Sequence, residues 1–230
     1  MCQCVGVRVG ILGGTGPLGR GLAVRLAAAG TAVTVGSRDP ERATAVVGEV
    51  LGQWPGRALD LTGGPNEEAA GADVVVVSTP WDAAVPTVRP LAGALEGKLV
   101  VSVANALVKQ GRELHPLIPP RGSVAAAVQA ALPGSHLAAA GHHLPAASLE
   151  DLDEVLGADV LVCSDQDEAR ARTMDLVSSI AGLRPLDAGS LASASAIEAF
   201  TAVLVNLNIR YKGHSTLRLA GLDHVGATAP

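Results

Sequence analysis

Aromatic side chains are scarce in this sequence, and the shortage decides what its core is made of. The 230 residues include 2 Trp, 1 Tyr and 1 Phe, so aromatics make up 2% of the chain. Hydrophobic residues still account for 48% and charged residues for 17%, which is typical of a globular protein with a sizeable core. We therefore expect Ala, Val and Leu to fill the core of one large α/β domain, or of one domain with a small appendage.

Excess positive charge and long apolar runs are also lacking. The formal net charge is −5 and the pI is near 5.6, which argues against a nucleic-acid-binding surface because such surfaces are basic. No apolar run reaches the roughly 18 residues that a helix needs to span a bilayer, so we expect no membrane partner. The first residues, 1–4, contain no basic stretch, and we expect no signal peptide.

Cysteine is nearly absent, with three residues in the whole sequence. Cys2 and Cys4 are too close together for an ordinary disulfide, and a C-x-C pair without further ligands is not a zinc motif. Cys163 ends an apolar run and is interpreted as a core thiol. This usage fits a reducing, cytoplasmic setting, and it predicts neither a metal site nor a catalytic thiol.

The most informative stretch present is a glycine-rich turn near the start, with the sequence GGTGPLG over residues 13–19. It follows the apolar run 7–12 and precedes a helical pattern that ends at a glycine, so it joins a strand to a helix. Gly14, Gly16 and Gly19 keep the spacing G-x-G-x-x-G, which permits a tight turn, backbone approach to a pyrophosphate and close helix–strand packing. The N–H groups at the start of a helix favour an anion. The turn therefore predicts a nucleotide site.

Strands and helices alternate after this turn, which predicts a doubly wound Rossmann fold of the α/β class with a mostly parallel sheet. A boundary near residue 189 divides the chain into a Rossmann domain, 1–189, and a small C-terminal helical domain, 190–230. We expect strands over 7–12, 31–35, 58–61, 73–78, 98–103 and 159–163, and a turn with a short edge strand within 182–189. We also expect an irregular segment over 62–66 and an extended one over 138–144. We expect helices over 18–29, 40–54, 81–95, 123–132, 167–180 and 193–208, a loop over 116–122 and a short helical run within 215–230.

The residues after the second strand indicate which dinucleotide is bound. An NAD-specific fold normally places an acid here to bind the ribose 2′-hydroxyl, whereas this chain has Ser37 and Arg38, followed by Arg42. A hydroxyl and two guanidiniums suit a 2′-phosphate, with Thr15 as a further donor. Asp39 is expected to cap the second helix and so to point at backbone N–H groups. The alternative is that both arginines are solvated surface charges; we favour NADP.

Four segments in this order and spacing resemble the NADPH-dependent deazaflavin reductases, also called coenzyme F420:NADP oxidoreductases. They are the turn 13–19, the V-G-S-R segment at 35–38, the dipeptide Pro80-Trp81, and G-L-R-P-L-D-A-G at 182–189. The last segment is the most specific of the four. The resemblance covers roughly residues 7–215.

The resemblance implies reversible hydride transfer between C5 of reduced coenzyme F420, an 8-hydroxy-5-deazaflavin, and C4 of the NADP nicotinamide. It also implies a homodimer whose partners are these two small molecules, stacked in a cleft between the domains. By motif matching, the adenosine-phosphate and pyrophosphate part of NADP falls on Gly14, Thr15, Gly16, Pro17, Leu18, Ser37, Arg38 and Arg42. The nicotinamide half falls near Thr79, Trp81, Ala83 and Asn105, and the ring-stacking pocket falls on Ala146.

Hydride transfer between two planar rings needs alignment and exclusion of water more than acid–base groups. The catalytic candidates are His142 and His143, which would relay or stabilise the proton that leaves the deazaflavin; the alternative is a structural histidine pair. A basic rim for the acidic deazaflavin tail is expected from Arg210, Lys212 and Arg218. Two other functions stay open: another NADP-dependent reductase of the imine or pyrroline-carboxylate type, and a non-catalytic NADP-sensing module.

Overall fold

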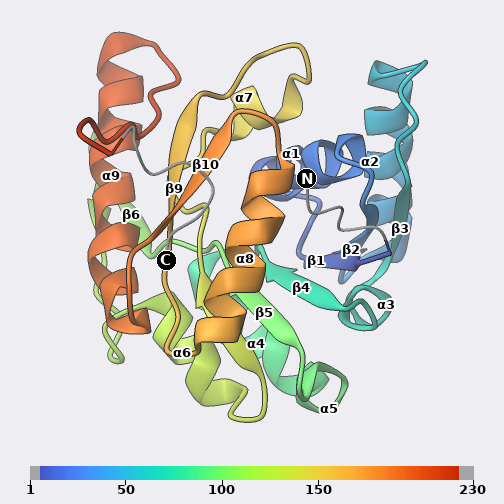
Figure 1. Cartoon of the computed structure of the whole chain (residues 1–230), viewed down its shortest axis with the longest axis horizontal. Helices are drawn as coiled ribbons and strands as arrows, with labels where there is room; N and C mark the ends of the chain where they lie inside the picture. The colour runs from blue at the N-terminus through green and yellow to red at the C-terminus, as the bar shows by residue number, and fades with distance from the viewer. Residues whose placement is uncertain (1–5, 223–230) are drawn as a thin grey trace.

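Six parallel strands form the central sheet of this protein, which a computed structural model describes over residues 6–222 (Figure 1). The strand order places the first strand in the middle, between two halves that wind in opposite directions, as in dinucleotide-binding folds. The fold class predicted from the sequence is therefore confirmed. Across the sheet the order is β3 (Leu61–Pro65), β2 (Ala32–Ser37), β1 (Arg8–Leu12), β4 (Val74–Val77), β5 (Leu99–Ser102) and β8 (His136–Ala139).

Two further strands continue the sheet beyond β8. An antiparallel bridge between Ala139 and Cys163 joins β8 to the segment that ends β9 (Ala158–Val162), and β10 (Leu183–Asp187) pairs parallel with β9. Cys163 is fully buried at this bridge with a free thiol, as expected for a core cysteine. Burial raises the pKa of that thiol to about 12, so it is unreactive at neutral pH.

Helices cover both faces of the sheet, because successive side chains of each strand point alternately into two apolar cores. Val74 and Val76 face one core, and Val75 and Val77 face the other. In Figure 1, α8 crosses in front of the sheet, α9 stands at its left end, and α2 and β3 lie at its right end. The helices are α1 (Pro17–Ala28), α2 (Pro40–Gln53), α3 (Asn66–Ala70), α4 (Trp81–Val88), α5 (Ala92–Leu95), α6 (Val124–Ala131), α7 (Ala146–Glu150), α8 (Asp167–Ser179) and α9 (Ala194–Tyr211), with single 3-10 turns at Arg89–Leu91 and Leu191–Ser193.

The third strand is displaced from its predicted place. The sequence predicted a strand over 58–61 and an irregular segment over 62–66, whereas β3 occupies Leu61–Pro65. The reason lies in α2, which packs directly on this strand: a Cβ on Gly63 would lie 2.5 Å from the carbonyl carbon of Ala43. Glycine is thus required in β3 by a close helix–strand approach, which local propensity does not reveal.

Four other elements differ from the sequence expectations. Residues 107–116 form a hairpin, β6 (Leu107–Gln110) and β7 (Glu113–Pro116), that was not predicted, and α7 was not predicted either. The helix predicted over 81–95 is divided into two helices and a 3-10 turn near Pro90, since proline cannot donate a backbone hydrogen bond. No helix forms over 215–222, and residues 223–230 of the predicted helical run lie outside the described residues.

The helical segment Leu191–Tyr211 is, by length and composition alone, long and apolar enough to cross a membrane, with a mean hydropathy of 1.3. The segment is not a continuous apolar run, because Glu198, Asn206 and Arg210 interrupt it. In the fold, α9 packs against α6 and β7. Its Asn206 side chain exchanges two hydrogen bonds of 2.8 Å with the backbone of Leu114 in β7, which fixes the helix to the rest of the protein.

A buried carboxylate joins α9 to α6. Both oxygens of Glu198 accept hydrogen bonds from the first backbone N–H groups of α6, at 2.8 Å from Val124 and 3.0 Å from Ala125. Helix N-termini favour a negative charge. Burial nevertheless outweighs these bonds and raises the pKa of Glu198 to about 7.

Glu198 is expected to make stability fall as the pH rises. The unfolded side chain ionises near 4.5 and the folded one near 7, so stability present below the lower value is lost as the pH rises through the upper one. The loss amounts to about 3 kcal/mol. Urea unfolding at pH 5 to 8 should show this slope in the wild type and lose it in Glu198→Gln. Glu168→Gln, at an exposed position of α8, is the control; an unchanged slope in Glu198→Gln would contradict the prediction.

Candidate functional site

The glycine turn lies against the end of β2 and against Thr79, which follows β4, and each glycine meets a different constraint. Gly13 has a left-handed φ of 68°, and a Cβ on Gly19 would lie 2.6 Å from the Cα of Gly14. Gly14 donates its N–H to the carbonyl of Gly36 at 2.9 Å. A Cβ on Gly16, by contrast, would meet nothing nearer than 4.0 Å. Three glycines therefore serve packing, and Gly16 leaves its backbone open to a ligand.

A cavity of about 530 Å³ lies in front of this turn. It opens at the carboxyl ends of β1, β2 and β4, where ligands of doubly wound folds bind. One buried hydroxyl of its wall, Oγ1 of Thr79, has no hydrogen-bond partner within the described structure, so it is available to a ligand. The cavity is lined by Gly13, Thr15, Gly16, Ser37, Arg38, Asp39, Arg42, Asn66, Ser78, Thr79, Pro80, Ala83 and Thr87.

Two guanidiniums give one end of this cavity its positive charge. Arg38 and Arg42 are exposed, and among residues 6–222 no carboxylate forms an ion pair with either of them. Asp39 caps α2 by accepting the backbone N–H of Arg42 at 3.2 Å, so its carboxylate is engaged with the helix as predicted. The net result is a cationic end that suits a phosphate group.

A smaller cavity of about 260 Å³ adjoins the first and shares Arg38, Asn66, Ala83 and Thr87 with it. Its other walls are Glu67, Pro86 of α4, and Pro90 and Leu91 of the 3-10 turn that follows. A slot with apolar walls beside a guanidinium suits a planar base.

A separate cavity of about 380 Å³ lies beside Leu18, in the first turn of α1. It is called the second cavity below, and the cavity in front of the glycine turn is the first. Its walls come from the segment 142–147, from the inner face of α9 and from residues that follow that helix. Leu18, Asn105, Leu107, His142, His143, Leu144, Pro145, Ala146, Ala147, Thr201, Leu204, Val205, Asn208, Gly213 and His214 line it. The wall is mostly apolar with a few polar groups, as in sites for planar ring systems.

The two histidines of this second cavity differ in their bonds. Nε2 of His143 lies 2.7 Å from the carbonyl oxygen of Asp159 and donates to it, which fixes the ring. Neither ring nitrogen of His142 has a partner in the described part of the chain. Burial, with a smaller effect from His143, lowers the pKa of His142 to about 3, so this ring is neutral at physiological pH. Its carbonyl accepts a hydrogen bond from Nδ2 of Asn105 at 2.8 Å.

Helix α1 connects the two cavities. Its N-cap, Gly16, lines the first cavity, and Leu18 in its first turn lines the second. Its far end carries a buried guanidinium, Arg25, that holds α7 in place. Arg25 donates to the carbonyls of Ser148 at 2.7 Å, Leu149 at 3.0 Å and Glu154 at 3.0 Å, and also to Asp151. The contact is close, since a Cβ on Gly21 of α1 would lie 2.5 Å from the Cβ of Leu149. The position of α7, and hence of Ala146 in the second cavity, depends on α1.

The predicted site residues divide between the cavities. Thr15, Gly16, Ser37, Arg38, Arg42, Thr79 and Ala83 line the first, and Leu18, Asn105, Ala146, His142 and His143 line the second. Gly14 is buried beneath the turn, and neither Pro17 nor Trp81 lines either cavity. Of the three predicted rim cations, Arg210 pairs with Glu113 at 3.2 Å and Arg218 lies 3.9 Å from Asp159.

Some wall residues were missed from the sequence, although their spacing carries a signal. Thr201, Leu204 and Asn208 line the second cavity and recur at the three- and four-residue spacing of one helix face. Asn66, whose Oδ1 accepts the N–H of Gly13 at 3.2 Å, follows the glycine strand β3 that was itself misplaced. Among the described residues no group of three or more His, Cys, Asp or Glu side chains is arranged to hold a metal ion.

The fold and the first cavity define a dinucleotide-binding protein of the doubly wound class. A family model described as "NADP oxidoreductase coenzyme F420-dependent" matches residues 8–106. The F420-dependent NADP reductase of Methanocaldococcus jannaschii is 38% identical over 224 residues, which cover 94% of this chain and 100% of that protein. The protein of the same name from Methanothermobacter marburgensis is 33% identical over 94% of this chain and 97% of its own length.

This chain belongs to the family of F420-dependent NADP reductases, and the resemblance seen in its sequence is confirmed. Among solved structures, a protein from Arthrobacter sp. FB24, described as a candidate F420-dependent NADP reductase, superposes with a TM-score of 0.79 at 23% identity. The match covers 94% of this chain and 100% of that one. At this identity the match shows a shared fold.

Proposed function

We propose that this protein catalyses reversible hydride transfer between C5 of reduced coenzyme F420, an 8-hydroxy-5-deazaflavin, and C4 of the nicotinamide of NADP. The observation that carries the proposal is that the start of α1 borders two cavities, one through Thr15 and Gly16 and the other through Leu18. Membership of the family of F420-dependent NADP reductases supports the same two ligands.

NADP is assigned to the first cavity. Ser37, Arg38 and Arg42 would hold the 2′-phosphate, and the adenine would occupy the adjoining slot beside Arg38. The open backbone at Gly16 and the N-terminus of α1 would receive the pyrophosphate. The unpartnered hydroxyl of Thr79 would meet the nicotinamide half.

The deazaflavin ring is assigned to the second cavity, against Ala146 and the adjacent backbone. Hydride transfer requires the two rings to be aligned and shielded from water, and both ligands carry their own redox chemistry. The imidazole of His142 is neutral, and neither of its nitrogens has a partner among the described residues, so it would offer one donor and one acceptor to the polar edge of the ring. His143, engaged with Asp159, would support this wall; proton relay by either histidine stays a prediction.

The direct test is to mix purified protein with NADPH and oxidised coenzyme F420 and to follow the deazaflavin absorbance. We expect it to fall as the ring is reduced, with one NADPH consumed per deazaflavin. Tight NADP binding without a fall in the deazaflavin absorbance would contradict the proposal. Turnover of NADPH with a cyclic imine would then indicate an imine or pyrroline-carboxylate reductase, and no turnover at all an NADP-sensing module.

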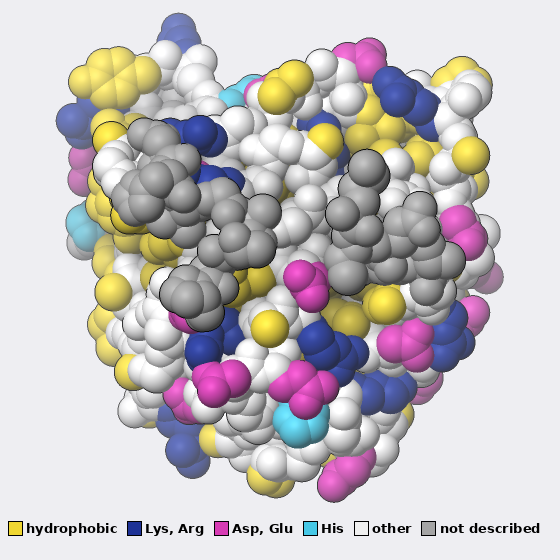
Figure 2. Space-filling model, in the orientation of Figure 1, with side chains coloured by type: hydrophobic (Ala, Val, Ile, Leu, Met, Phe, Trp, Pro, Cys, Tyr) yellow, Lys and Arg dark blue, Asp and Glu magenta, His cyan; other side chains and the backbone are white. Residues whose placement is uncertain are grey.

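Three further features complete the proposal. The outer face of α9 carries Phe200, Val203 and Leu207, which are 40%, 49% and 38% exposed, and hydrophobic side chains gather over this helix at the left of Figure 2. Such a stripe suits self-association of two copies, so we propose a homodimer formed through this face.

We also propose a domain boundary near residue 189 and a cytoplasmic location, the latter because Cys163 is a free, buried thiol.

A further inference from the structure

The chain that follows α9 forms a strap, defined here as residues 213–222, along the edge of β9. It begins where Lys212 adopts a left-handed φ of 53°. Asn208, in the last turns of α9, then turns the chain back, because its Oδ1 accepts both the N–H and the hydroxyl of Ser215 at 2.6 Å. The strap contributes Gly213 and His214 to the wall of the second cavity.

Asp159 of β9 holds the middle of the strap through both its backbone and its side chain. Its N–H donates to the carbonyl of Leu217 at 2.8 Å, and its Oδ2 accepts the N–H of Leu219 at 2.7 Å. Its own carbonyl accepts from Nε2 of His143 at 2.7 Å. One residue thus fixes two walls of the same cavity, the strap and the histidine ring.

Arg184 of β10 completes the attachment. Its guanidinium forms a two-pronged ion pair with Asp159, with both N–O distances at 2.7 Å. The same group donates to two strap carbonyls, Leu219 at 3.2 Å and Leu222 at 2.8 Å. The Asp159 carboxylate is fully buried and the Arg184 side chain is 19% exposed, so the pair is shielded from water and geometrically specific.

We propose that the Asp159–Arg184 pair positions the strap as a wall of the second cavity and thereby sets affinity for the deazaflavin without affecting NADP. The proposal rests on the assignment of the deazaflavin to this cavity. Neither residue touches the cavity, so both act as positioning residues. Arg184 belongs to the segment 182–189 that carried the sequence resemblance. The proposal therefore assigns a structural role to the arginine of that segment.

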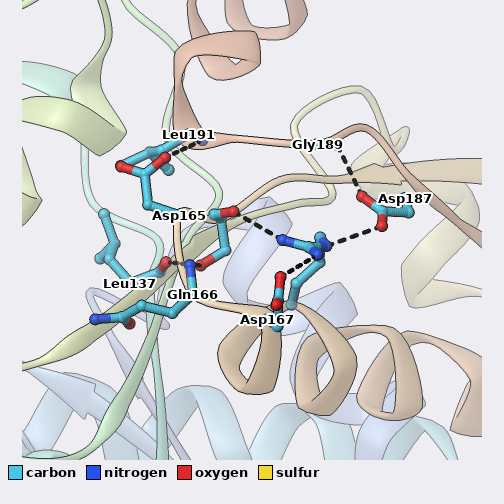
Figure 3. A network of polar contacts seen from close by, with 9 residues as sticks. Leu137, Asp165, Gln166, Asp167, Asp187, Gly189 and Leu191 are labelled. Atoms are coloured by element: carbon cyan, nitrogen blue, oxygen red, sulfur yellow. Dashed lines mark hydrogen bonds and ion pairs between the residues drawn. The ribbon is translucent and has the colours of Figure 1, made fainter.

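The same segment provides a matched control at the other end of β10. Asp187 accepts from Nε of Arg170 at 2.9 Å and from the N–H of Gly189 at 2.8 Å. Arg170 also donates to Asp167 at 2.5 Å and to the carbonyl of Ser164 at 3.0 Å. Figure 3 shows this network, which joins α8 to β10 and contains no residue of the strap or of either cavity. The Arg170 side chain is also 19% exposed.

The test compares Arg184→Met, Arg184→Lys and Arg170→Met with the wild type. We expect Arg184→Met to raise the KM for coenzyme F420 about tenfold, the size of effect expected for lost positioning hydrogen bonds, and to leave the KM for NADPH unchanged. Arg184→Lys keeps the charge opposite Asp159 but lacks the fork, so it should fold and show a smaller rise. Arg170→Met should destabilise the protein without changing either KM. Equal changes in both KM values, or no change in the Arg184 variants, would overturn the proposal.

A second readout does not depend on activity. Hydrogen exchange of the free protein should show faster exchange at the amides of Leu219 and the rest of the strap in the Arg184 variants, and not in Arg170→Met. Unchanged strap exchange in the Arg184 variants would overturn the proposal. Failure of the wild type to reduce coenzyme F420 is a separate result: it would reject the proposed function, while the exchange data would still decide whether Arg184 fixes the strap.

Discussion

Replacement of Arg38 by alanine is expected to raise the KM for NADPH by about a hundredfold, with little change in the KM for NADH. Arg38 borders both the first cavity and its adjoining slot, so it is placed to bind the 2′-phosphate and to lie against the adenine. A hydrogen bond to a charged group contributes about 1.5–3 kcal/mol, and each 1.4 kcal/mol corresponds to about a factor of ten in affinity. NADH lacks the phosphate and loses only the contact with the base.

Initial rates with each dinucleotide, at saturating coenzyme F420, measure this effect. Arg42→Ala is expected to act in the same direction, since Arg42 lines the same end of the cavity. Arg112→Ala serves as the control, because Arg112 is an exposed arginine of the β6–β7 turn and lines neither cavity. An equal rise in the KM for NADPH and the KM for NADH would show that Arg38 does not bind the 2′-phosphate.

Replacement of Ala146 by phenylalanine is expected to lower kcat/KM for coenzyme F420 by at least about a hundredfold and to leave NADP binding intact. Ala146 begins α7 and lines the second cavity. A phenyl ring there would occupy the space assigned to the deazaflavin, and α7 cannot retreat because Arg25 and Gly21 fix it against α1. A misplacement of reacting atoms by about 1 Å already lowers rates by about a hundredfold.

Titration of each variant with NADP, followed by the turnover assay, separates the two ligands. Ala146→Ser, which adds one small atom, should keep most of the activity and so controls for substitution at this helix start. If Ala146→Phe instead weakens NADP binding and leaves the KM for coenzyme F420 unchanged, the two cavities have been assigned to the wrong ligands.

The local sequence was sufficient to predict the structure of a segment wherever the interactions that fix that structure lie within the segment itself. Asp39 followed by Pro40 begins α2 as predicted, because capping and a fixed φ act over a few residues. The run of four valines in β4 is buried on both faces as expected of a central parallel strand. The same local logic located the glycine turn and the arginines beside it, which now line one cavity.

Local sequence was insufficient wherever a distant segment sets the constraint. Gly63 appears irregular until α2 is seen packed on β3. The second cavity combines α1, the segment after β8, α9 and the strap, and no sequence spacing relates these parts. Arg184 was recognisable as part of a family segment, but its partners, Asp159 and the strap carbonyls, lie 25 to 38 residues away.

The doubly wound core, the dinucleotide turn and the charge that favours NADP follow from the residue order alone, because strand patterning, glycine conformation and helix capping are short-range effects. The shape of the second cavity and the attachment of its walls become visible in the folded protein. Arg25 and Arg184 each bind backbone carbonyls of segments that lie far from them in the chain and that adjoin the residues of this cavity. Such contacts depend on how the layers pack, which no local pattern encodes.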